Sequence, residues 1–285
     1  MISTKTRICG LIGNPVEHSV SPEMHNAAFE KLGLNFIYLP FRVTPENLEK
    51  AILGMRGLGM VGFNVTMPHK ASIMKFLDEI DKTAEKIGAV NTIVNKDGKL
   101  LGFNTDGPGA LWAFQEAGVN FKNKKVVMLG AGGAAKAIAF YLMPLIKKLV
   151  IAGKTREEAQ SLAKDLKKYF KKEIKGIENN TDNLRQELKN AQILINATPI
   201  GMAPDINSMP IKTELLRSNL TVFDSIYNPI ETKLLREARK IGAKTINGVN
   251  MLVYQGAEAF KLWTGKNAPV ELMKKIVIKR LKNVN

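Results

Sequence analysis

The sequence is poor in residues that several common kinds of site require. One cysteine, Cys9, stands among 285 residues, which excludes an internal disulfide framework and a metal site built from several cysteines. Only three histidines are present, and none has the neighbouring base and nucleophile of a hydrolytic triad. The longest apolar run, residues 137–146, is shorter than the ~20 residues that span a bilayer. We therefore expect a protein of a reducing, cytoplasmic compartment without a metal or a membrane span.

Acidic residues are also scarce, with 26 Asp and Glu against 42 Lys and Arg, which gives a formal charge of +16. Residues 1–110 hold 12 basic and 11 acidic residues, whereas residues 111–285 hold 30 and 15. Such an excess suggests a nucleic-acid partner, but no aromatic interleaving or DNA-reading motif accompanies it. In the amphipathic stretch 157–170 the lysines lie off the apolar stripe, as on a solvated helix. We expect no nucleic-acid or membrane partner, and keep a nucleic-acid-binding protein as the alternative from another class.

Strand-like and helix-like segments alternate along the chain. Residues 7–12 form a short apolar run that ends at a Gly-Asn-Pro turn, and residues 89–95 and 99–104 are predicted to be paired strands around Asp97-Gly98. Repeated strand–helix units predict an α/β fold whose parallel sheet has helices on both faces. The length predicts about two domains.

A glycine-rich loop, Gly130-Ala131-Gly132-Gly133-Ala134-Ala135, follows the apolar strand 125–129 and opens the helical run 136–142. It matches the G-x-G-x-x-[GA] pattern in the strand–loop–helix context of dinucleotide-binding proteins. There the first glycine permits a tight turn, and the second lets a pyrophosphate approach the backbone at the helix N-terminus. A dinucleotide site is favoured over a purely structural turn.

The next strand, 149–152, indicates which dinucleotide is bound. NAD-binding proteins place an acid near the end of this strand to bind the ribose 2′-hydroxyl. Here the strand is followed by Gly153-Lys154-Thr155-Arg156, and no acid appears before Glu157. Lys154, Thr155 and Arg156 offer charge and hydrogen bonds to a 2′-phosphate. The pattern predicts NADP(H) over NAD(H), the alternative being that these cations are ordinary surface residues.

The first part of the chain carries several polar motifs. Ser19 and Ser21 can present two hydroxyls to one anion, or they can serve as a turn residue and a helix cap. A polar run from Asn64 to Lys70 follows a short strand, where α/β proteins bind ligands, although Lys70 can equally be a surface lysine. Asp106 lies in a glycine-flanked loop, where a turn aspartate is the alternative.

Taken in order, these motifs resemble those of the shikimate/quinate dehydrogenase family over nearly the whole chain. The motifs are Asn14-Pro15 with Ser19-x-Ser21-Pro22, Asn64-Val-Thr-x-Pro-x-Lys70, Gly88-Ala-Val-Asn-Thr92, Asn104-Thr-Asp-Gly107, the glycine loop, Asn196-Ala-Thr-Pro-Ile-Gly-Met202, Asp224-Ser-Ile-Tyr-Asn-Pro-Ile-Glu-Thr232 and Asn247-Gly-Val-Asn-Met-Leu-Val-Tyr-Gln-Gly256. The resemblance implies an N-terminal α/β substrate domain, 1–106, completed by 249–285. It also implies a Rossmann-like NADP-binding domain, 107–248, with a cleft between the two.

The resemblance implies the reversible reduction of 3-dehydroshikimate to shikimate with NADPH, on the route to chorismate and the aromatic amino acids. Lys70 and Asp106 are the expected catalytic pair, because a lysine can stabilise the charge on a carbonyl oxygen and give it a proton. Which of the two transfers the proton stays open. The other implied substrate residues are Ser19, Ser21, Asn64, Thr66, Asn91, Tyr227 and Gln255. Besides the glycine loop and residues 154–156, the implied cofactor residues are Thr198, Gly248 and Met251.

The chain departs from the family at one cofactor segment. Where the family usually has Asn-Arg-Thr, this chain has Gly153-Lys154-Thr155. A lysine cannot make the bidentate fork that arginine makes on a phosphate, so the preference for NADP is expected to be less strict unless Arg156 compensates. Activity on quinate is the alternative within the enzyme class. A monomer or a homodimer is expected.

Overall fold

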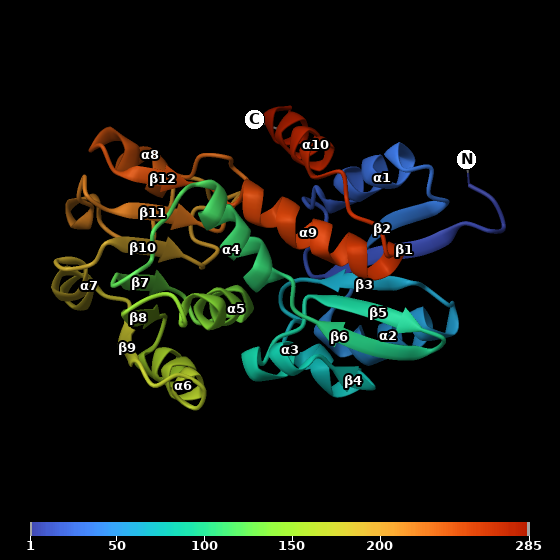
Figure 1. Ribbon diagram of the computed structural model, residues 1–285, viewed down its shortest axis with the longest axis horizontal. Coiled ribbons are helices and arrows are strands. Elements are labelled where there is room, and N and C mark those ends of the chain that lie inside the picture. The colour runs from blue at the N-terminus through green and yellow to red at the C-terminus, as the bar shows by residue number, and fades with distance from the viewer. Residues whose placement is uncertain (1, 284–285) are drawn as a thin grey trace. The chain divides into compact units, whose positions relative to one another are not determined.

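The computed structural model describes residues 2–283, and the chain divides into two compact units. Among these residues, unit 1 contains 2–109 and 253–283, and unit 2 contains Ala110–Leu252. Both are α/β units with a six-stranded sheet (Figure 1). The expected α/β fold with parallel strands is confirmed.

Unit 1 is built on a mixed sheet of order β2-β1-β3-β5-β6-β4. Strands β1, β2 and β3 are parallel, whereas β5 runs antiparallel to both β3 and β6. Its elements are β1 (Arg7–Gly13), α1 (Ser21–Lys31), β2 (Phe36–Arg42), η1 (Pro45–Asn47), α2 (Leu48–Gly57), β3 (Gly62–Val65), η2 (Ser72–Phe76), β4 (Glu79–Ile80), α3 (Lys82–Ile87), β5 (Thr92–Lys96), β6 (Lys99–Phe103), the end of α9 (Val249–Thr264) and α10 (Val270–Lys282).

One side of this sheet is covered by an aromatic cluster from α1, β2 and α9. The ring of His25 stacks on that of Tyr38 with centroids 4.5 Å apart, and Phe29 stacks on Phe260 at 5.1 Å. Within residues 2–283 neither ring nitrogen of His25 has a hydrogen-bond partner, and burial lowers the pKa of His25 to about 3. His25 is therefore a neutral, packed residue of the first helix, and Cys9 is fully buried, as the sequence predicts.

Unit 2 is built on an all-parallel sheet of order β12-β11-β10-β7-β8-β9, the doubly wound order of dinucleotide-binding domains. The order reverses between β7 and β10, so the loops that follow these two strands lie next to one another. Its elements are the part of α4 (Asp106–Glu116) from Ala110 onward, β7 (Lys125–Leu129), α5 (Gly133–Leu142), β8 (Lys148–Gly153), α6 (Arg156–Lys167), β9 (Glu173–Glu178), α7 (Thr181–Leu188), β10 (Ile193–Asn196), η3 (Thr213–Leu215), β11 (Thr221–Asp224), α8 (Lys233–Lys240), β12 (Lys244–Ile246) and the start of α9.

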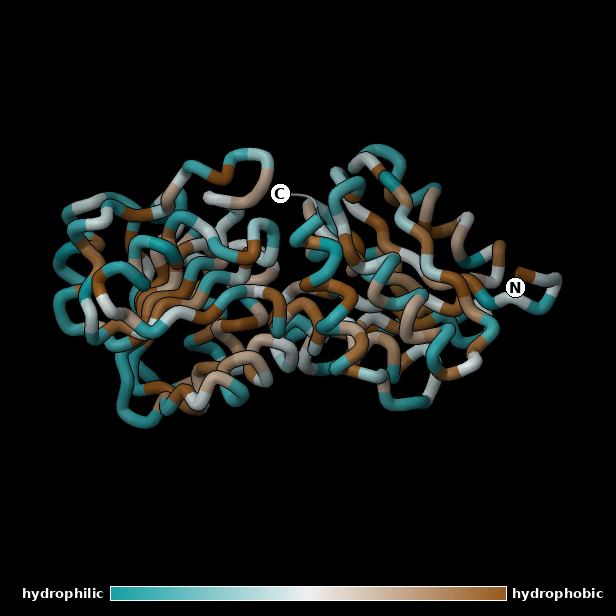
Figure 2. The backbone as a smooth tube through the Cα atoms, turned by 90° about the horizontal axis from the view of Figure 1, so that it is seen from above, coloured by the Kyte–Doolittle hydropathy of each residue, from teal (hydrophilic) through white to brown (hydrophobic). Residues whose placement is uncertain are grey.

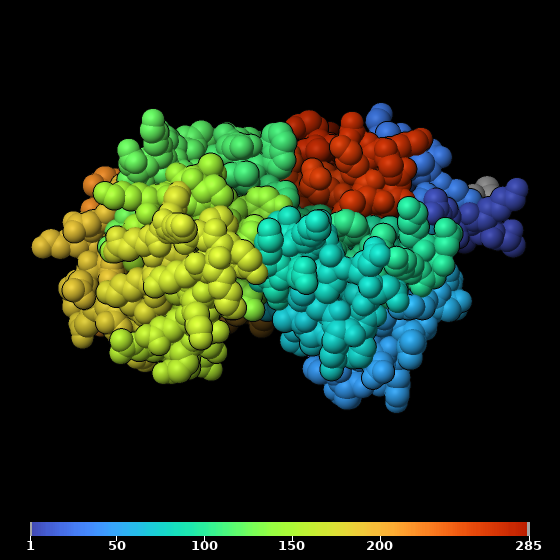
Figure 3. All heavy atoms as spheres, turned by 60° about the horizontal axis from the view of Figure 1, so that its bottom comes forward, coloured from blue at the N-terminus to red at the C-terminus, as the bar shows by residue number. Residues whose placement is uncertain are grey.

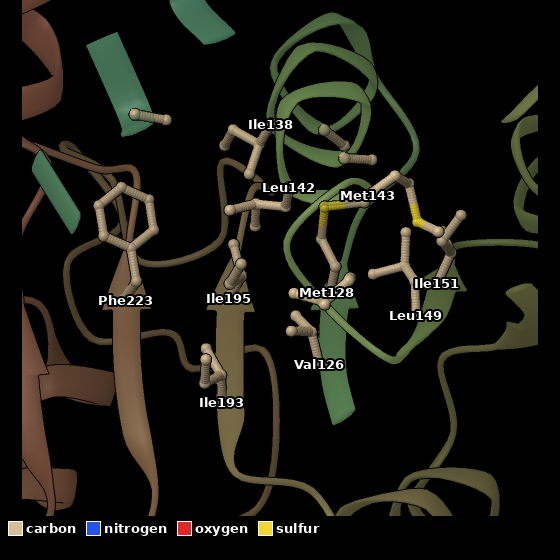
Figure 4. Close-up of a cluster of buried hydrophobic side chains, with 14 of the residues drawn as sticks. Val126, Met128, Ile138, Leu142, Met143, Leu149, Ile151, Ile193, Ile195 and Phe223 are labelled. Atoms are coloured by element: carbon tan, nitrogen blue, oxygen red, sulfur yellow. The ribbon is translucent and has the colours of Figure 1, made fainter. Parts of the chain in front are cut away.

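Alternate residues of these strands pack on opposite faces of the sheet. Val126 and Met128 of β7 belong to the cluster that α4, α5 and α6 cover, whereas Val127 and Leu129 belong to the cluster under α7 and α8. In Figure 4 the side chains of the first cluster point from the strands toward α5. The hydrophobic strands lie inside this unit and hydrophilic segments lie around them (Figure 2).

Several local predictions are confirmed. The hairpin turns at Asp97 and Gly98, both of which have positive φ. The amphipathic stretch is α6, whose apolar stripe is buried and whose lysines are exposed. The yellow-green part of the chain that contains α6 lies at the surface of its unit (Figure 3). The alternative interpretation of Ser21 as a helix cap is wrong, because in the described chain α1 begins at Ser21, after Val20, with no side-chain cap.

A buried polar network connects the ends of β10 and β11. Oδ1 of Asp224 accepts hydrogen bonds from Nδ2 of Asn196 at 3.0 Å and from the backbone N–H of Ile226 at 3.1 Å. Its Oδ2 accepts from the hydroxyl of Thr232 at 2.7 Å. Burial raises the pKa of Asp224 to about 6, although these three hydrogen bonds oppose the rise.

We predict that Asp224 makes the protein less stable at high pH. The folded state holds this proton more tightly than the unfolded chain, so the contribution of Asp224 is full below pH 3.8 and is lost as the pH rises through about 6. The free energy of unfolding of Asp224→Asn relative to wild type should therefore increase by about 1 kcal/mol from pH 5 to pH 8. Urea titrations at the two pH values measure this difference. Asp182→Asn, at an exposed site, is the control, and an equal pH response in wild type and Asp224→Asn would contradict the prediction.

Candidate active site

A buried ion pair joins two of the expected catalytic residues. Lys70 lies in the turn after β3, and Asp106 is the first residue of α4. The Nζ atom of Lys70 is 2.5 Å from Oδ2 of Asp106, and their side chains are 17% and 7% exposed. A charge withdrawn from water is costly unless it is paired, and here each residue provides the partner of the other. Lys70 is therefore not an ordinary surface lysine, and Asp106 is not a solvated turn aspartate.

Asn91 occupies the other oxygen of the same carboxylate. Its Nδ2 donates to Oδ1 of Asp106 at 2.9 Å and to Oε1 of Gln255 at 3.3 Å. Gln255 comes from α9, 164 residues away in the sequence. The structure thus brings together Lys70, Asn91, Asp106 and Gln255 from four separate segments of unit 1.

Four further expected substrate residues lie on α1, on β3 or in the loops next to these two elements. The hydroxyl of Ser19 accepts the backbone N–H of Ser21 at 3.2 Å, which is a turn role, and Ser21 is buried. Thr66 follows β3 and is half-buried. Asn64 lies on β3 itself and is buried, and both of its amide hydrogens are donated within the protein, to the backbone oxygen of Asn91 and to the hydroxyl of Thr92.

Three polar side chains that bond to Asn91 or to Asn64 have no role in the prediction from the sequence. Thr92 and Thr105 both hydrogen-bond to Oδ1 of Asn91, and Tyr38 donates to Asn64. The two threonines stand inside motifs that point to the family, so their position was a usable signal. Tyr38 lies outside those motifs, and no pattern around it in the sequence indicates its hydrogen bond.

The glycine loop of unit 2 has the form that a dinucleotide pyrophosphate requires. Gly130 has φ +103°, and a Cβ there would come within 2.9 Å of the backbone oxygen of Ala197, in the loop after β10. At Gly132 the space where a Cβ would stand is open. Among the described residues no side chain caps α5, and its first turn contains no acid. The first-turn N–H groups and the helix dipole thus favour an anion at this loop, which Ala131, Gly133 and Ala134 complete.

The segment after β8 also fits a phosphate, with a difference from the family. Lys154, Thr155 and Arg156 are all exposed, and the hydroxyl of Thr155 caps α6 by accepting the N–H of Glu158. A Cβ at Gly153 would come within 2.7 Å of the backbone oxygen of Thr155 and 3.0 Å of the backbone nitrogen of Ala159. The asparagine that is usual in the family has no room here, because α6 lies too close to the strand.

The remaining expected cofactor and substrate residues of unit 2 lie in three loops and one helix. Thr198 follows β10, and its hydroxyl donates to Oδ1 of Asn196 at 2.6 Å. Tyr227 lies in the loop after β11, and Gly248 immediately precedes α9. Met251, on α9, is 6% exposed and belongs to the hydrophobic core of this unit. None of these residues belongs to unit 1.

In residues 2–283 no group of three or more His, Cys, Asp or Glu side chains is arranged to hold a metal ion. No helix in the same range combines the length and the apolar composition that a membrane span needs.

Three family models match the chain one after another. The shikimate dehydrogenase substrate binding domain matches residues 11–93, shikimate/quinate 5-dehydrogenase matches residues 112–229, and the shikimate 5′-dehydrogenase C-terminal domain matches residues 248–278. The first match contains Lys70 and Asn91, and the second contains the glycine loop.

Known proteins resemble the chain over its whole length. Shikimate dehydrogenase (NADP(+)) of Methanocaldococcus jannaschii is 54% identical over 282 residues, which cover 99% of each chain. A crystal structure of a shikimate dehydrogenase in complex with NADP+ has a TM-score of 0.92 and 51% identity, and covers 99% of this chain and 98% of its own. Shikimate 5-dehydrogenase of Listeria monocytogenes, in complex with shikimate and NAD, has a TM-score of 0.88 and 38% identity, covering 97% of this chain and 98% of its own.

These matches confirm the resemblance on which the expected site depends. With relatives that share about half of the residues across almost the entire length, the chain belongs to the shikimate dehydrogenase family.

Proposed function

We propose that this protein is an NADP-dependent oxidoreductase that catalyses the reversible reduction of 3-dehydroshikimate to shikimate, on the route to chorismate and the aromatic amino acids. The observation that carries the proposal is the buried pair of Lys70 and Asp106, held together with Asn91. The relative that is 54% identical and bears the name shikimate dehydrogenase (NADP(+)) supports the choice of substrate and cofactor.

Lys70 supplies what the oxygen of a reacting ketone needs. Negative charge develops on that oxygen as the carbon is reduced, and a fixed ammonium group stabilises this charge and donates the proton. Asp106, 2.5 Å from Nζ, holds the ammonium group in one position. In the direction of oxidation the same pair accepts the proton from the shikimate hydroxyl.

The other residues of the proposed site orient the substrate. Ser19 and Ser21 bind its carboxylate, and Tyr227 lies near that group. Thr66, Asn91, Asp106 and Gln255 bind ring hydroxyls and the reacting carbonyl. This assignment makes residues 1–106 with 249–285 the substrate domain and 107–248 the NADP-binding domain.

The cofactor is held by unit 2. Gly130, Ala131, Gly132, Gly133 and Ala134 bind the pyrophosphate, and Lys154, Thr155 and Arg156 bind the 2′-phosphate. Thr198, Gly248 and Met251 line the remainder of the site. NADP(H), when bound, supplies or accepts the hydride. The protein works in the cytoplasm on small molecules, as a monomer or a homodimer.

The activity is tested directly by initial rates with shikimate and with quinate, each with NADP+ and with NAD+. We expect the highest kcat/KM for shikimate with NADP+, because no acid at the end of β8 repels a 2′-phosphate. Turnover of quinate with NAD+ at a higher kcat/KM would contradict the proposal. Absence of turnover with all four pairs, together with salt-sensitive retention on DNA, would favour a nucleic-acid-binding protein.

Lys70→Ala should lose most of kcat and keep much of the affinity for shikimate. Removal of one transition-state donor typically lowers kcat by ~10²–10³, whereas the other contacts with the substrate remain. Steady-state kinetics and calorimetric titration of shikimate measure the two effects. Lys50→Ala, at an exposed lysine of the same unit, is the control and should match wild type. A Lys70→Ala enzyme that works at the wild-type rate would exclude Lys70 from the chemistry.

The double variant Lys154→Ala/Arg156→Ala should weaken NADP+ and leave NAD+ nearly unaffected. Two charge-assisted contacts with the 2′-phosphate are lost, so KM for NADP+ should rise about tenfold or more. The ratio of kcat/KM for the two cofactors is the measurement. Lys164→Ala, on the same helix, controls for the general effect of positive charge. An equal rise of KM for both cofactors would mean that these residues do not recognise the 2′-phosphate.

A further inference from the structure

A row of buried hydrogen bonds leads from β2 across the sheet of unit 1 to the Lys70–Asp106 pair. The hydroxyl of Tyr38 donates to Oδ1 of Asn64 at 2.8 Å, and Nδ2 of Asn64 donates to the hydroxyl of Thr92 at 3.1 Å. The hydroxyl of Thr92 in turn donates to Oδ1 of Asn91 at 3.1 Å. Tyr38 and Thr92 are 0% exposed and Asn64 is 6% exposed. These three side chains are therefore shielded from solvent and act through their neighbours.

This row of hydrogen bonds ends at the side-chain amide of Asn91. Its Oδ1 accepts the backbone N–H of Thr105 at 2.7 Å, and its Nδ2 donates to Asp106. A rotation of the amide by half a turn would place its oxygen against the carboxylate of Asp106, where two acceptors would repel each other. The orientation of the Asn91 amide therefore decides whether Asp106 receives this hydrogen bond. Any donor to Oδ1 of Asn91 favours the orientation in which it does.

Thr92 is such a donor because Asn64 restricts its hydroxyl. Asn64 and Thr92 are directly opposite each other in the antiparallel register of β3 and β5. Nδ2 of Asn64 donates to the hydroxyl oxygen of Thr92, which leaves the single hydroxyl hydrogen for Oδ1 of Asn91 or for Thr105. The first of these acceptors is an atom of Asn91, and the second, the hydroxyl of Thr105, accepts a hydrogen bond from Nδ2 of Asn91.

Tyr38 fixes the orientation of the Asn64 amide in the same way as Asn64 restricts the hydroxyl of Thr92. Its hydroxyl donates to Oδ1 of Asn64, so the Nδ2 of Asn64 faces Thr92 and the backbone oxygen of Asn91. The ring of Tyr38 cannot shift easily, because it stacks on His25 at 4.5 Å and lies 5.9 Å from the ring of Trp263. The donor is thus held by a rigid aromatic cluster.

We propose that Tyr38, Asn64 and Thr92 form a positioning relay that holds Asn91, and through it Asp106 and Lys70, in the geometry for proton transfer. Asn64 is then a positioning residue, although the family resemblance suggests a substrate contact. The relay deepens the proposed function and, where turnover is the readout, rests on it.

Thr92→Val removes the hydroxyl and keeps the shape of the side chain. We expect kcat for shikimate oxidation to fall about tenfold, as for the loss of one buried hydrogen bond. Thr92→Ser restores the hydroxyl and should return kcat to within about twofold of wild type. Assays at a temperature well below the unfolding midpoint, with the folded fraction checked by circular dichroism, separate this effect from a loss of stability.

Thr264→Val is the matched control in the same unit. The hydroxyl of Thr264 donates to the backbone oxygen of Phe260 at 2.8 Å and has no part in the relay. This variant should keep the wild-type kcat even if its unfolding midpoint falls. A Thr92→Val enzyme with the wild-type kcat, or a Thr264→Val enzyme with the same tenfold loss, would overturn the proposal.

Tyr38→Phe tests the relay if Thr92→Val does not fold, because it removes only one hydroxyl from a ring that stays in place. Its kcat should also fall. In the double variant Tyr38→Phe/Thr92→Val the fall in kcat should equal that of Thr92→Val alone. The reason is that Tyr38 acts on Asn91 only through Thr92, so removal of its hydroxyl has no further effect once the hydroxyl of Thr92 is lost. Losses that multiply, or a Tyr38→Phe enzyme with unchanged kcat, would show that the residues do not act in series.

A readout without turnover separates this proposal from the proposed function. The ¹⁵N–¹H resonances of the Asn91 side-chain amide report its hydrogen bonds directly. They should shift in Thr92→Val and stay in place in Thr264→Val. If wild type turns over no shikimate, the proposed function fails, and these resonances still decide on the relay: unchanged positions in Thr92→Val would overturn it.

Discussion

The need to pair the buried carboxylate of Asp106 is the constraint on which the arrangement of the segments around it in unit 1 depends. A carboxylate that is 7% exposed is stable as an ion only when cations and donors replace the lost water. Lys70 supplies the cation at one oxygen, and Asn91 supplies a donor at the other. These groups come from the turn after β3, the residue before β5 and the start of α4. The register of β3, β5 and β6 must therefore hold for the ion pair to exist.

In unit 2 the corresponding constraint is the close approach of backbone segments. Gly153 and Gly176 lie on neighbouring strands, and a Cβ at either position would come within 3 Å of backbone atoms in or next to α6. Because both positions are glycine, α6 packs against β8 and β9 more closely than it could if either position carried a side chain. At Gly153 this packing leaves no room for a side chain. It leaves the charged residues Lys154 and Arg156, at the start of the helix, as the groups that can meet a phosphate.

The basic residues in excess in residues 111–285 have more than one structural role. Lys125 and Lys175 both contact the carboxylate of Glu187, a buried residue of α7. Burial opposes the ionisation of Glu187, but the hydrogen bonds and charges of the two lysines outweigh it and lower its pKa. These lysines therefore join α7 to β7 and β9. Other lysines, such as Lys164 and Lys167, are exposed on α6, where they keep a helix surface hydrated.

The sequence by itself determined the α/β class, the glycine loop, the hairpin at Asp97-Gly98, the amphipathic α6 and the family. Each depends on neighbouring residues or on motif order, which a linear chain displays directly. Only the tertiary structure decided that Ser21 begins α1 without capping it, and that Gly153 leaves no room for a side chain. It also decided that Gln255 contacts Asn91, and that Tyr38, Asn64 and Thr92 connect to Asp106. Such contacts join residues up to 164 positions apart, and they follow from strand register and helix packing, which no local pattern records.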